Sequence, residues 1–293
     1  MSPAAPSVAP ATRPSTGRRV IFNADDFGRS SSINHAVIEA HTRGILTTAS
    51  LMVTGEAFDE AVSLARQTPS LGVGLHLTLA DGRAATRHAD FPGLVDREGN
   101  LRGSPVRAGF DYFFLRSLRP ALREEIRGQI ARFRATGIPL DHLNGHLNIH
   151  LHPVVFDLLM ELHPEWRGAG FRLTRDPLGI NARAARGRWA YRLTHAVVFG
   201  LLSRRAAGRL AGLGIPHTRA VFGLLQYPSV DEAYLLRVLE QLPEGDSEIY
   251  SHPSLDHFRH EHAALLSPRV RGLLETLGIR AIRYSDLPAC QSD

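Results

Sequence analysis

Short apolar runs of β type alternate with longer segments of helical periodicity along most of the chain, beginning at Arg19. The pattern predicts strands at Val20–Asn23, Thr47–Val53, Gly72–Leu79, Leu140–Asn144, Phe171–Thr174, Thr218–Phe222, Glu248–Ser251 and Ala281–Tyr284. It predicts helices at Ile33–Arg43, Ala57–Arg66, Ala121–Ala135, Val154–His163, Trp189–Ala211, Asp231–Gln241 and His262–Leu277. Strands that alternate with helices are typical of a parallel sheet covered by helices. Since the chain contains no Gly-rich dinucleotide fingerprint, we expect one α/β domain over residues 19–293, folded as a closed or nearly closed barrel.

Two segments depart from this alternation. Residues 1–18 are rich in Pro, Ala, Ser and Thr and lack the apolar stretch of a signal peptide, so we expect a disordered leader. The segment Asp81–Arg119 is rich in Gly and Arg and poorly periodic, which indicates an excursion over one mouth of the barrel.

Composition excludes several classes of protein. Hydrophobic residues make up 43% and charged residues 22% of the 293 positions, and no window approaches the roughly 18 uninterrupted apolar residues of a membrane span. The single cysteine, Cys290, excludes an internal disulfide and a cysteine-built zinc site and fits a reducing cytoplasm. The chain has no lysine and a net charge of +5, without the basic run and interleaved aromatics of a nucleic-acid binder.

Polar residues gather where several predicted strands end. Asp25 and Asp26 follow the first strand, His76 lies late in the third, His146 follows the fourth, and His252 ends a late one. In parallel barrels the loops at that end converge on one mouth, where the chemistry collects. These side chains therefore predict a site on one rim.

Adjacent carboxylates such as Asp25 and Asp26 repel each other unless a positive charge lies beside them. A divalent metal would use the two differently, one as ligand and one to take a proton from a metal-bound water. The alternative is that Asp25 caps a helix and Asp26 is solvated.

The segment Asp141–Pro153 carries polar residues at every even position from 142 to 152. Period-two alternation predicts that its imidazoles and amides share one face of an extended segment. One or two of its histidines would suffice for a metal, and the others would support them or contact substrate. The alternatives are a histidine-rich surface strand here, a core histidine at His76, and a turn histidine before Pro253 at His252.

The combination of these motifs resembles the YdjC/ChbG-like carbohydrate deacetylases over about residues 20–287. The resemblance lies in Asn23-Ala24-Asp25-Asp26-Phe27-Gly28, Gly74-Leu75-His76, the segment Asp141–Pro153 and Ser251-His252-Pro253. Within the family, the segments Arg43–Val53, Ala135–Asn144 and Ala220–Leu225 are most similar to the HpnK group of hopanoid-biosynthesis deacetylases.

The resemblance implies a distorted (β/α) barrel of the glycoside hydrolase/deacetylase type that holds one divalent ion, Mg or Zn. Its ligands would be Asp26, His76 and His146, with Asp25 as general base and His252 as general acid. The candidates for substrate contact are Asn144, Asn148 and His150. The family pattern has a histidine where this chain has Asn148 and a longer polar residue where it has Leu147, so substrate contact there is expected to differ.

The expected reaction is hydrolysis of an N-acetyl group from an N-acetylglucosamine-type sugar, either lipid-linked, as in an N-acetylglucosaminyl hopanoid, or a free chito-oligosaccharide. A glycosidase is disfavoured because its two carboxylates must flank the bond, which adjacent residues cannot easily do. A phosphoesterase, another amidohydrolase and a non-catalytic sugar- or metal-binding protein remain as alternatives.

The segment Trp189–Arg205 is apolar between arginines, with Trp189 and Tyr191 at one end. Such a helix could lie in a membrane interface, or it could be an outer barrel helix packed on the sheet. We expect a cytoplasmic protein. If the helix lies in a membrane interface, the protein would also contact the inner membrane peripherally.

Overall fold

The computed structural model describes residues 17–185 and 187–288. The leader, apart from its last two residues, and Cys290 lie outside that range. The strands are β1 (Arg19–Phe27), β2 (Thr48–Leu51), β3 (Gly72–Leu77), β4 (Leu140–Gly145), β5 (Gly170–Phe171), β6 (Ala220–Phe222), β7 (Asp246–Ser251) and β8 (Arg280–Ala281). The α-helices are α1 (Ser31–Arg43), α2 (Phe58–Gln67), α3 (Pro105–Phe114), α4 (Arg119–Ala135), α5 (Pro153–Glu161), α6 (Leu178–Ala184), α7 (Trp189–Gly212), α8 (Glu232–Leu239), α9 (Arg259–Leu266) and α10 (Pro268–Thr276). Four short 3₁₀ helices within the described ranges are η1 (Arg116–Leu118), η2 (His146–Leu151), η3 (His163–Glu165) and η4 (Tyr284–Asp286).

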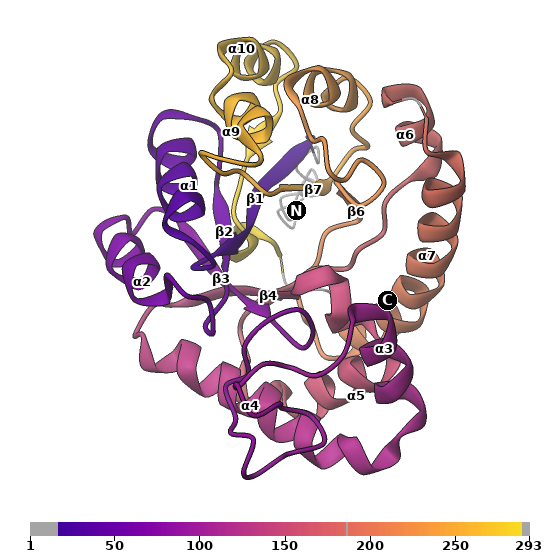
Figure 1. Ribbon diagram of the computed structural model, residues 1–293. Coiled ribbons are helices and arrows are strands. Elements are labelled where there is room, and N and C mark those ends of the chain that lie inside the picture. Colours follow the sequence, from indigo (N-terminus) through magenta and orange to yellow (C-terminus); the bar gives the residue numbers. More distant parts are fainter. Residues whose placement is uncertain (1–16, 186, 289–293) are drawn as a thin grey trace, which may run out of the picture.

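The strands form one parallel sheet in the order β5-β4-β3-β2-β1-β7-β6, curled into a distorted barrel with the helices outside it (Figure 1). The edge strands β5 and β6 do not pair with each other as a ladder. Two backbone hydrogen bonds link their flanking segments, from Phe171 N to Pro216 O at 2.8 Å and from Val221 N to Arg175 O at 2.9 Å. The expectation of a nearly closed (β/α) barrel is therefore confirmed.

Strand β8 pairs with the first residues of β1, where β2 has not yet begun: Val20 lies opposite Ala281, whereas β2 joins β1 only at Asn23. The chain that follows β8 fills the amino-terminal end of the barrel. There Tyr284, Ile282 and Leu287 pack against Ile21 of β1.

Side chains alternate along the strands, with the apolar ones facing the helices. In β1, Val20, Phe22 and Ala24 belong to the main hydrophobic core, whereas Asn23 and Asp25 make polar contacts inside the barrel. The same alternation runs through β2 and β3, where Ser50 and His76 make polar contacts inside the barrel, because successive residues of a strand point to opposite faces. Above Tyr284 the barrel is consequently filled by hydrogen-bonded polar side chains.

The structure corrects the predicted elements in several places. The predicted helix His262–Leu277 is two helices, because Ser267 is extended before Pro268 and its hydroxyl caps α10. The excursion 81–119 contains α3, which begins with the same Ser-Pro signal at Ser104 and Pro105. Helix α6 was not predicted at all.

The extended segment predicted through the histidine-rich region is wrong beyond Gly145. Leu147 and Asn148 adopt left-handed backbone conformations, with φ of 55° and 56°, and residues 146–151 form 3₁₀ turns. The even-numbered side chains from 146 onward therefore do not share one face with those of β4, because a strand's alternation ends where its extended backbone ends.

Gly74 tests the packing of the barrel interior. A Cβ atom there would lie 2.5 Å from the imidazole of His142 on β4, so we expect Gly74→Ala to destabilise the protein by about 1–3 kcal/mol. The same substitution at Gly208, in α7, meets nothing within 4 Å and should stabilise by up to about 1 kcal/mol. Urea denaturation of both variants measures this, and equal effects would contradict the packing.

Candidate metal and catalytic site

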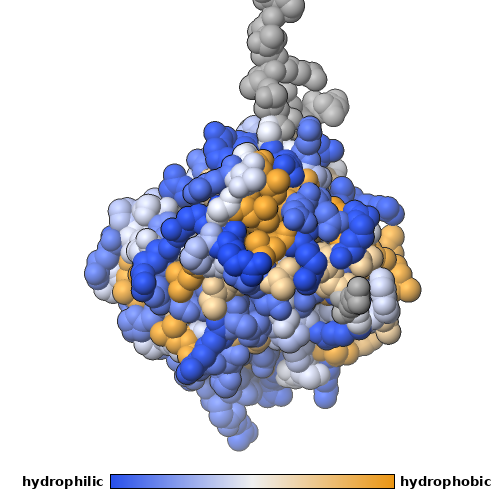
Figure 2. Space-filling model, turned by 90° about the horizontal axis from the view of Figure 1, so that it is seen from above, coloured by the Kyte–Doolittle hydropathy of each residue, from blue (hydrophilic) through white to orange (hydrophobic). Residues whose placement is uncertain are grey.

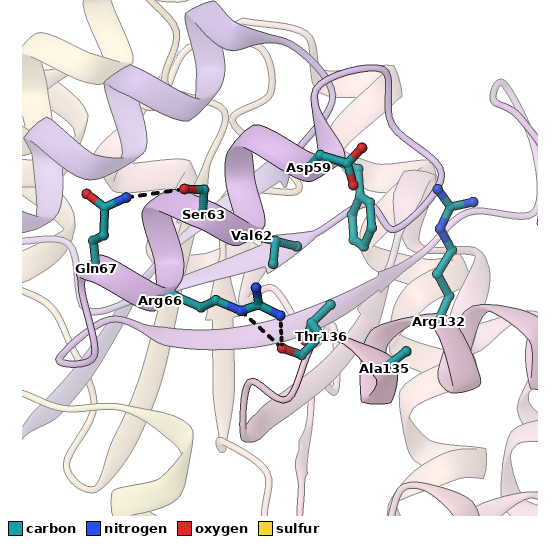
Figure 3. A pocket seen from close by; sticks show the side chains of 9 residues that line it. Asp59, Val62, Ser63, Arg66, Gln67, Arg132, Ala135 and Thr136 are labelled. Carbon is teal, nitrogen blue, oxygen red and sulfur yellow. Dashed lines mark hydrogen bonds between the residues drawn. The ribbon is translucent and has the colours of Figure 1, made fainter.

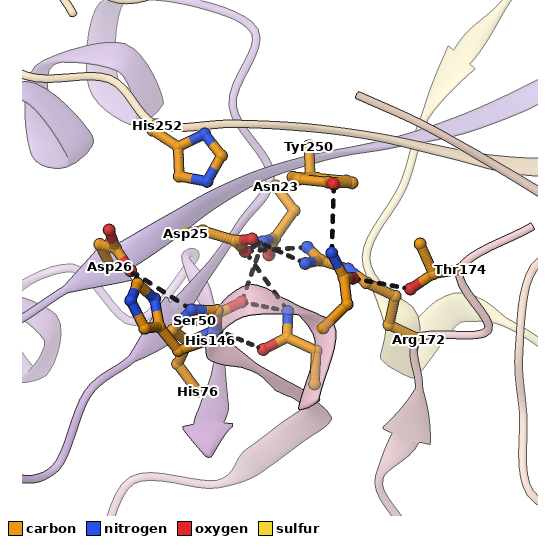
Figure 4. Close-up of polar contacts among 12 residues, drawn as sticks. Asn23, Asp25, Asp26, Ser50, His76, His146, Arg172, Thr174, Tyr250 and His252 are labelled. Atoms are coloured by element: carbon orange, nitrogen blue, oxygen red, sulfur yellow. Dashed lines mark hydrogen bonds and ion pairs between the residues drawn. The ribbon is translucent and has the colours of Figure 1, made fainter. Parts of the chain in front are cut away.

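The predicted site residues meet at the carboxyl end of the sheet (Figure 4). Strand pairing places Ala24 opposite Ser251 and His76 opposite Asn144, so the residues that follow these pairs converge on one mouth of the barrel. Asp25, Asp26, His76, His146 and His252 all line the same cavity there.

An irregularity in β1 turns both aspartates toward this mouth. The register between β1 and β2 shifts between Ala24 and Phe27, and Asp26 has a positive φ of 65°. In a regular strand, adjacent side chains point to opposite faces, whereas a bulge re-aims one of them. Asp25 consequently contacts the barrel interior, while Asp26 faces the two histidines.

Asp26, His76 and His146 form a compact buried group whose ligand atoms lie within 4.8 Å of one another. The Asp26 Oδ1 atom lies 3.0 Å from His146 Nδ1 and 3.3 Å from His76 Nε2. Burial raises the pKa of Asp26, but hydrogen bonds from the two histidines outweigh it and hold this pKa well below its usual range. An ionised carboxylate beside two imidazoles is a donor set that could hold a divalent metal ion.

Asn144 holds one of these histidines in a ligand-like orientation. Its Oδ1 atom lies 2.7 Å from His76 Nδ1 and can only accept, so Nδ1 carries a proton and Nε2, which is directed at Asp26, is the nitrogen available to a metal ion. The amide is itself fixed, because its Nδ2 donates to Ser50 Oγ at 2.7 Å. A histidine whose second nitrogen is anchored in this way is the usual arrangement at metal sites. The residues present therefore fit a metal ion.

Asp25 is neutralised by a buried arginine that lies on the other side of the barrel. Arg172 donates to both carboxylate oxygens of Asp25, at 2.7 and 2.9 Å, and twice to Glu248 Oε1, at 2.9 and 2.7 Å. The Tyr284 hydroxyl donates to the other oxygen of Glu248. Burial raises the pKa of Asp25, but Arg172 and then His76 outweigh it and hold this pKa far below its usual range.

His252 directly follows β7, lines the cavity and is supported by Glu261 of α9. The Glu261 Oε2 atom accepts the backbone N–H of His252 at 2.6 Å and lies 3.9 Å from its Nδ1. The rings of Tyr227, Tyr250 and Phe258 surround the imidazole at centroid distances of 5.3 to 6.0 Å.

Two cavities meet at this group. The first, of about 560 Å³, extends between α3 and α7 and has Val106, Tyr191 and Phe199 among its walls. The second, of about 960 Å³, has more polar walls, which include Arg29 and Arg83, and it also reaches Asp26 and His252. A further cavity of about 520 Å³ lies between α2 and α4, where Arg66 donates to the carbonyl of Thr136 (Figure 3), and none of the predicted site residues lines it.

The three residues predicted to contact substrate differ in position. Asn148 lines the first cavity and accepts a 2.9 Å hydrogen bond from Thr174. Asn144 and His150 are fully buried and absent from its walls, so their placement does not support substrate contact. His150 lies with its Nε2 3.0 Å from the carbonyl oxygen of Arg172, and burial, followed by the charge of Arg172, lowers its pKa to about 3.

Sequence reasoning missed Arg172, Glu248 and Glu261. One signal for Arg172 was available, a single charge in the middle of the predicted strand Phe171–Thr174. Glu248 opens a predicted strand and Glu261 precedes a predicted helix, and neither position marks a buried carboxylate.

The sequence of the chain is similar to that of known proteins. The family model described as YdjC-like protein matches residues 19–276. A carbohydrate deacetylase of Brevibacillus brevis is 39% identical over 149 residues, which are 51% of this chain and 57% of that protein. A carbohydrate deacetylase of Geobacillus stearothermophilus is 35% identical over 152 residues, 51% of this chain and 58% of that protein. The chain thus spans little more than half the length of these curated relatives.

The fold is also similar to a solved structure. A crystal structure of an Enterococcus faecalis V583 protein named for cellobiose-phosphate cleavage superposes with a TM-score of 0.69 at 22% identity, covering 92% of this chain and 98% of that one. At this identity the likeness supports the fold alone.

Asn144 tests the metal group. We expect Asn144→Leu to lower the affinity for Zn²⁺ or Co²⁺ by about 10–100-fold, because His76 loses the partner that orients its ring. His76→Ala should lower it further, and His163→Ala, remote from the group, should have no effect. Calorimetric titration measures the affinity. Unchanged binding by Asn144→Leu with a folded protein would contradict the orienting role.

Arg172 tests the interior charge arrangement. We expect Arg172→Met to destabilise the protein by about 3–5 kcal/mol, because Asp25 and Glu248 would be left as buried carboxylates without a cation. The control is Arg205→Met, which breaks a half-exposed ion pair with Asp157 and should cost at most about 1 kcal/mol. Chemical denaturation gives both values, and similar losses would refute the difference in role.

Proposed function

The chain belongs to the YdjC-like family, and on that premise we propose that it is a metal-dependent hydrolase that removes the acetyl group from an N-acetylglucosamine-type sugar. The observation that carries the proposal is that Asp25 and His252 face the same cavity as the Asp26–His76–His146 group. A ligand group alone would suit a binding protein, whereas a base and an acid beside it suit hydrolysis. The names of the curated relatives support the same reaction class.

Asp26, His76 and His146 would hold the ion. When bound, a divalent ion in such a site supplies Lewis-acid polarisation of a carbonyl oxygen and makes water more acidic. Asn144 binds Nδ1 of His76 and so leaves the Nε2 atom available to the ion. Because the His76 ring is fixed in this way, the three ligand atoms are held close together.

Asp25 is the proposed general base. Its carboxylate is ionised and held by Arg172 at 2.7 and 2.9 Å, so its orientation is set before substrate arrives. It takes the proton of the water whose oxygen attacks the acetamide carbonyl carbon.

His252 is the proposed general acid. Its protonated ring gives a proton to the sugar nitrogen as the carbon–nitrogen bond breaks, so acetate and a free amine leave. Glu261 accepts the backbone N–H of His252 at 2.6 Å and lies 3.9 Å from its Nδ1, so it holds this residue in place beside the cavity.

We further propose that the sugar is linked to a lipid, such as a hopanoid. The cavity that reaches Asp25 has Val106, Leu147, Phe199 and Leu224 among its walls, more apolar surface than a free sugar would need. The walls of the other cavity are more polar, and they would suit the sugar itself or its extension. A free chito-oligosaccharide, the alternative substrate, has no apolar group to fill the first cavity.

Acetate release tests the proposal. We expect metal-loaded protein to release acetate from an N-acetylglucosaminyl lipid faster than from N,N′-diacetylchitobiose. Asp25→Asn and His252→Ala should each lower kcat by about 10²–10⁴-fold, because each removes a proton-transfer group, while metal affinity is retained.

The matched control is His260→Ala. His260 is a nearby half-exposed histidine whose Nε2 lies 3.1 Å from the carbonyl oxygen of Pro228 and 4.0 Å from Glu261 Oε1. Its kcat should equal that of the wild type. Absence of acetate from both substrates with metal bound would leave a non-catalytic binding protein, and preference for chitobiose would refute the lipid linkage.

A further inference from the structure

Helix α7 turns apolar side chains outward as well as inward. Its exposed side chains include Trp189, Leu193, Val197 and Leu201, spaced four residues apart along one face and 53 to 59% exposed. No charged residue occurs from position 193 to 203. The residues that α7 buries include Arg192 and Ser203. A water-facing helix surface ordinarily carries polar and charged side chains.

Helix α3 also exposes large apolar side chains. Phe110, Phe113 and Phe114 are 50 to 68% exposed and contact one another, with ring centroids 5.0 Å apart for Phe113 and Phe114 and 6.3 Å apart for Phe110 and Phe114. The residues that α3 buries are Ala108 and Tyr112, whose hydroxyl donates to the carbonyl of Leu79. Three exposed phenylalanines on a ten-residue helix cannot be explained by the packing of the barrel.

Both helices border the mouth of the site. Val106 of α3 and Tyr191 and Phe199 of α7 line the cavity that reaches Asp26 and His76. In Figure 1 the two helices lie next to each other on the right of the barrel. Seen from above in Figure 2, apolar side chains line the right-hand edge, the side on which α7 lies in Figure 1. The exposed apolar faces are thus continuous with the candidate site.

Most of the charges around these faces are positive, apart from Asp157, which pairs with Arg205 and Arg209. Arg107 and Arg116 are exposed beside the phenylalanines, Arg188 is exposed just before α7, and Arg204 is exposed just after its uncharged stretch. Helix α7 contains no acidic residue, and the one acid of α3, Asp111, lies 3.4 Å from Arg107. Apolar and aromatic side chains flanked by arginines match a surface whose interior is hydrocarbon and whose headgroups are anionic.

We propose that α3 and α7 form a membrane-docking surface, made of Phe110, Phe113, Phe114, Leu115, Trp189, Leu193, Val197, Val198 and Leu201, which inserts into the headgroup region of an anionic bilayer. A protein partner that covered both helices would close the cavity mouth between them, whereas a bilayer can present a lipid-linked molecule to it. No helix among the described residues is long and apolar enough to cross a membrane. The biological purpose of this docking surface rests on the proposed function. Its binding to membranes does not, because that binding is measured without an activity assay.

Vesicle flotation with the full chain tests the docking surface. The protein should float with vesicles of phosphatidylcholine and phosphatidylglycerol, less with phosphatidylcholine alone, and less at high salt. Phe114→Ser combined with Leu193→Ser should lower the partition coefficient at least about tenfold, since two exposed apolar side chains no longer enter the bilayer.

The matched control is Leu213→Ser. Leu213 directly follows α7 and is 44% exposed, but it lines a separate cavity with His163 and Tyr284, outside the two that meet at the site. This variant should float like the wild type. All of these positions are exposed, and a matching melting temperature verifies that each variant folds.

Tryptophan fluorescence gives an independent reading. The chain has two tryptophans, and Trp166 is buried while Trp189 is 55% exposed. Anionic vesicles should therefore shift the emission to the blue through Trp189 alone, and Trp189→Phe should abolish the shift.

Each remaining outcome contradicts a specific claim. Absence of flotation by the wild type, or equal flotation of the double variant, overturns the docking surface. A dimer in analytical ultracentrifugation that Leu193→Ser dissociates would show that a second copy covers α7 and would overturn it as well. Acetate release from soluble chitobiose should be unchanged in the double variant, so loss of flotation with activity retained separates docking from the proposed function.

Discussion

The charge of Arg172 at the centre of the barrel is the interaction on which the site depends. It lies between Asp25 and Glu248 and is buried with both, so that each carboxylate has a cation against it in place of water. An isolated buried charge costs several kcal/mol, and mutual hydrogen bonds offset that cost. Its guanidinium also lies 4.3 Å from the ring centre of Tyr250, which closes the remaining side. Asp25 is thereby held ionised while Asp26 beside it is free to face the histidines.

The polar interior of the barrel follows from the alternation of its strands. Helices cover the outer face with hydrocarbon, and the inner face carries Asn23, Ser50, His142 and Asn144 in one hydrogen-bonded group that ends at Asp25 and His76. Tyr284 closes the other end, stacking on His142 at a centroid distance of 4.6 Å. A group satisfied in this way is rigid, because each lost contact would leave a buried polar atom unpaired. Rigidity of this kind suits a site that must hold ligand atoms at fixed positions.

The mouth of the barrel separates two kinds of surface. One arm of the cleft has more polar walls, near Arg29 and Arg83, and the other passes Phe199 toward the exposed faces of α3 and α7. Both arms meet at Asp26 and His252. An elongated molecule with a polar and an apolar end would find complementary walls on the two sides of the candidate site.

Local patterns in the sequence determined the strands, most helices and the identity of the residues at the strand ends, because alternation and helix periodicity are properties of neighbouring residues. They also indicated that Asp25, Asp26, His76, His146 and His252 lie near one another, since the ends of parallel strands meet at one rim. The choice of Asp26, His76 and His146 as ligands came from the family resemblance. Only the tertiary structure decided that Arg172, 147 positions from Asp25, neutralises it. It also decided that Asn144 supports His76, and that the extended pattern after Gly145 becomes turns. Contacts between distant segments depend on how the whole sheet curls, and no short window of sequence contains that information.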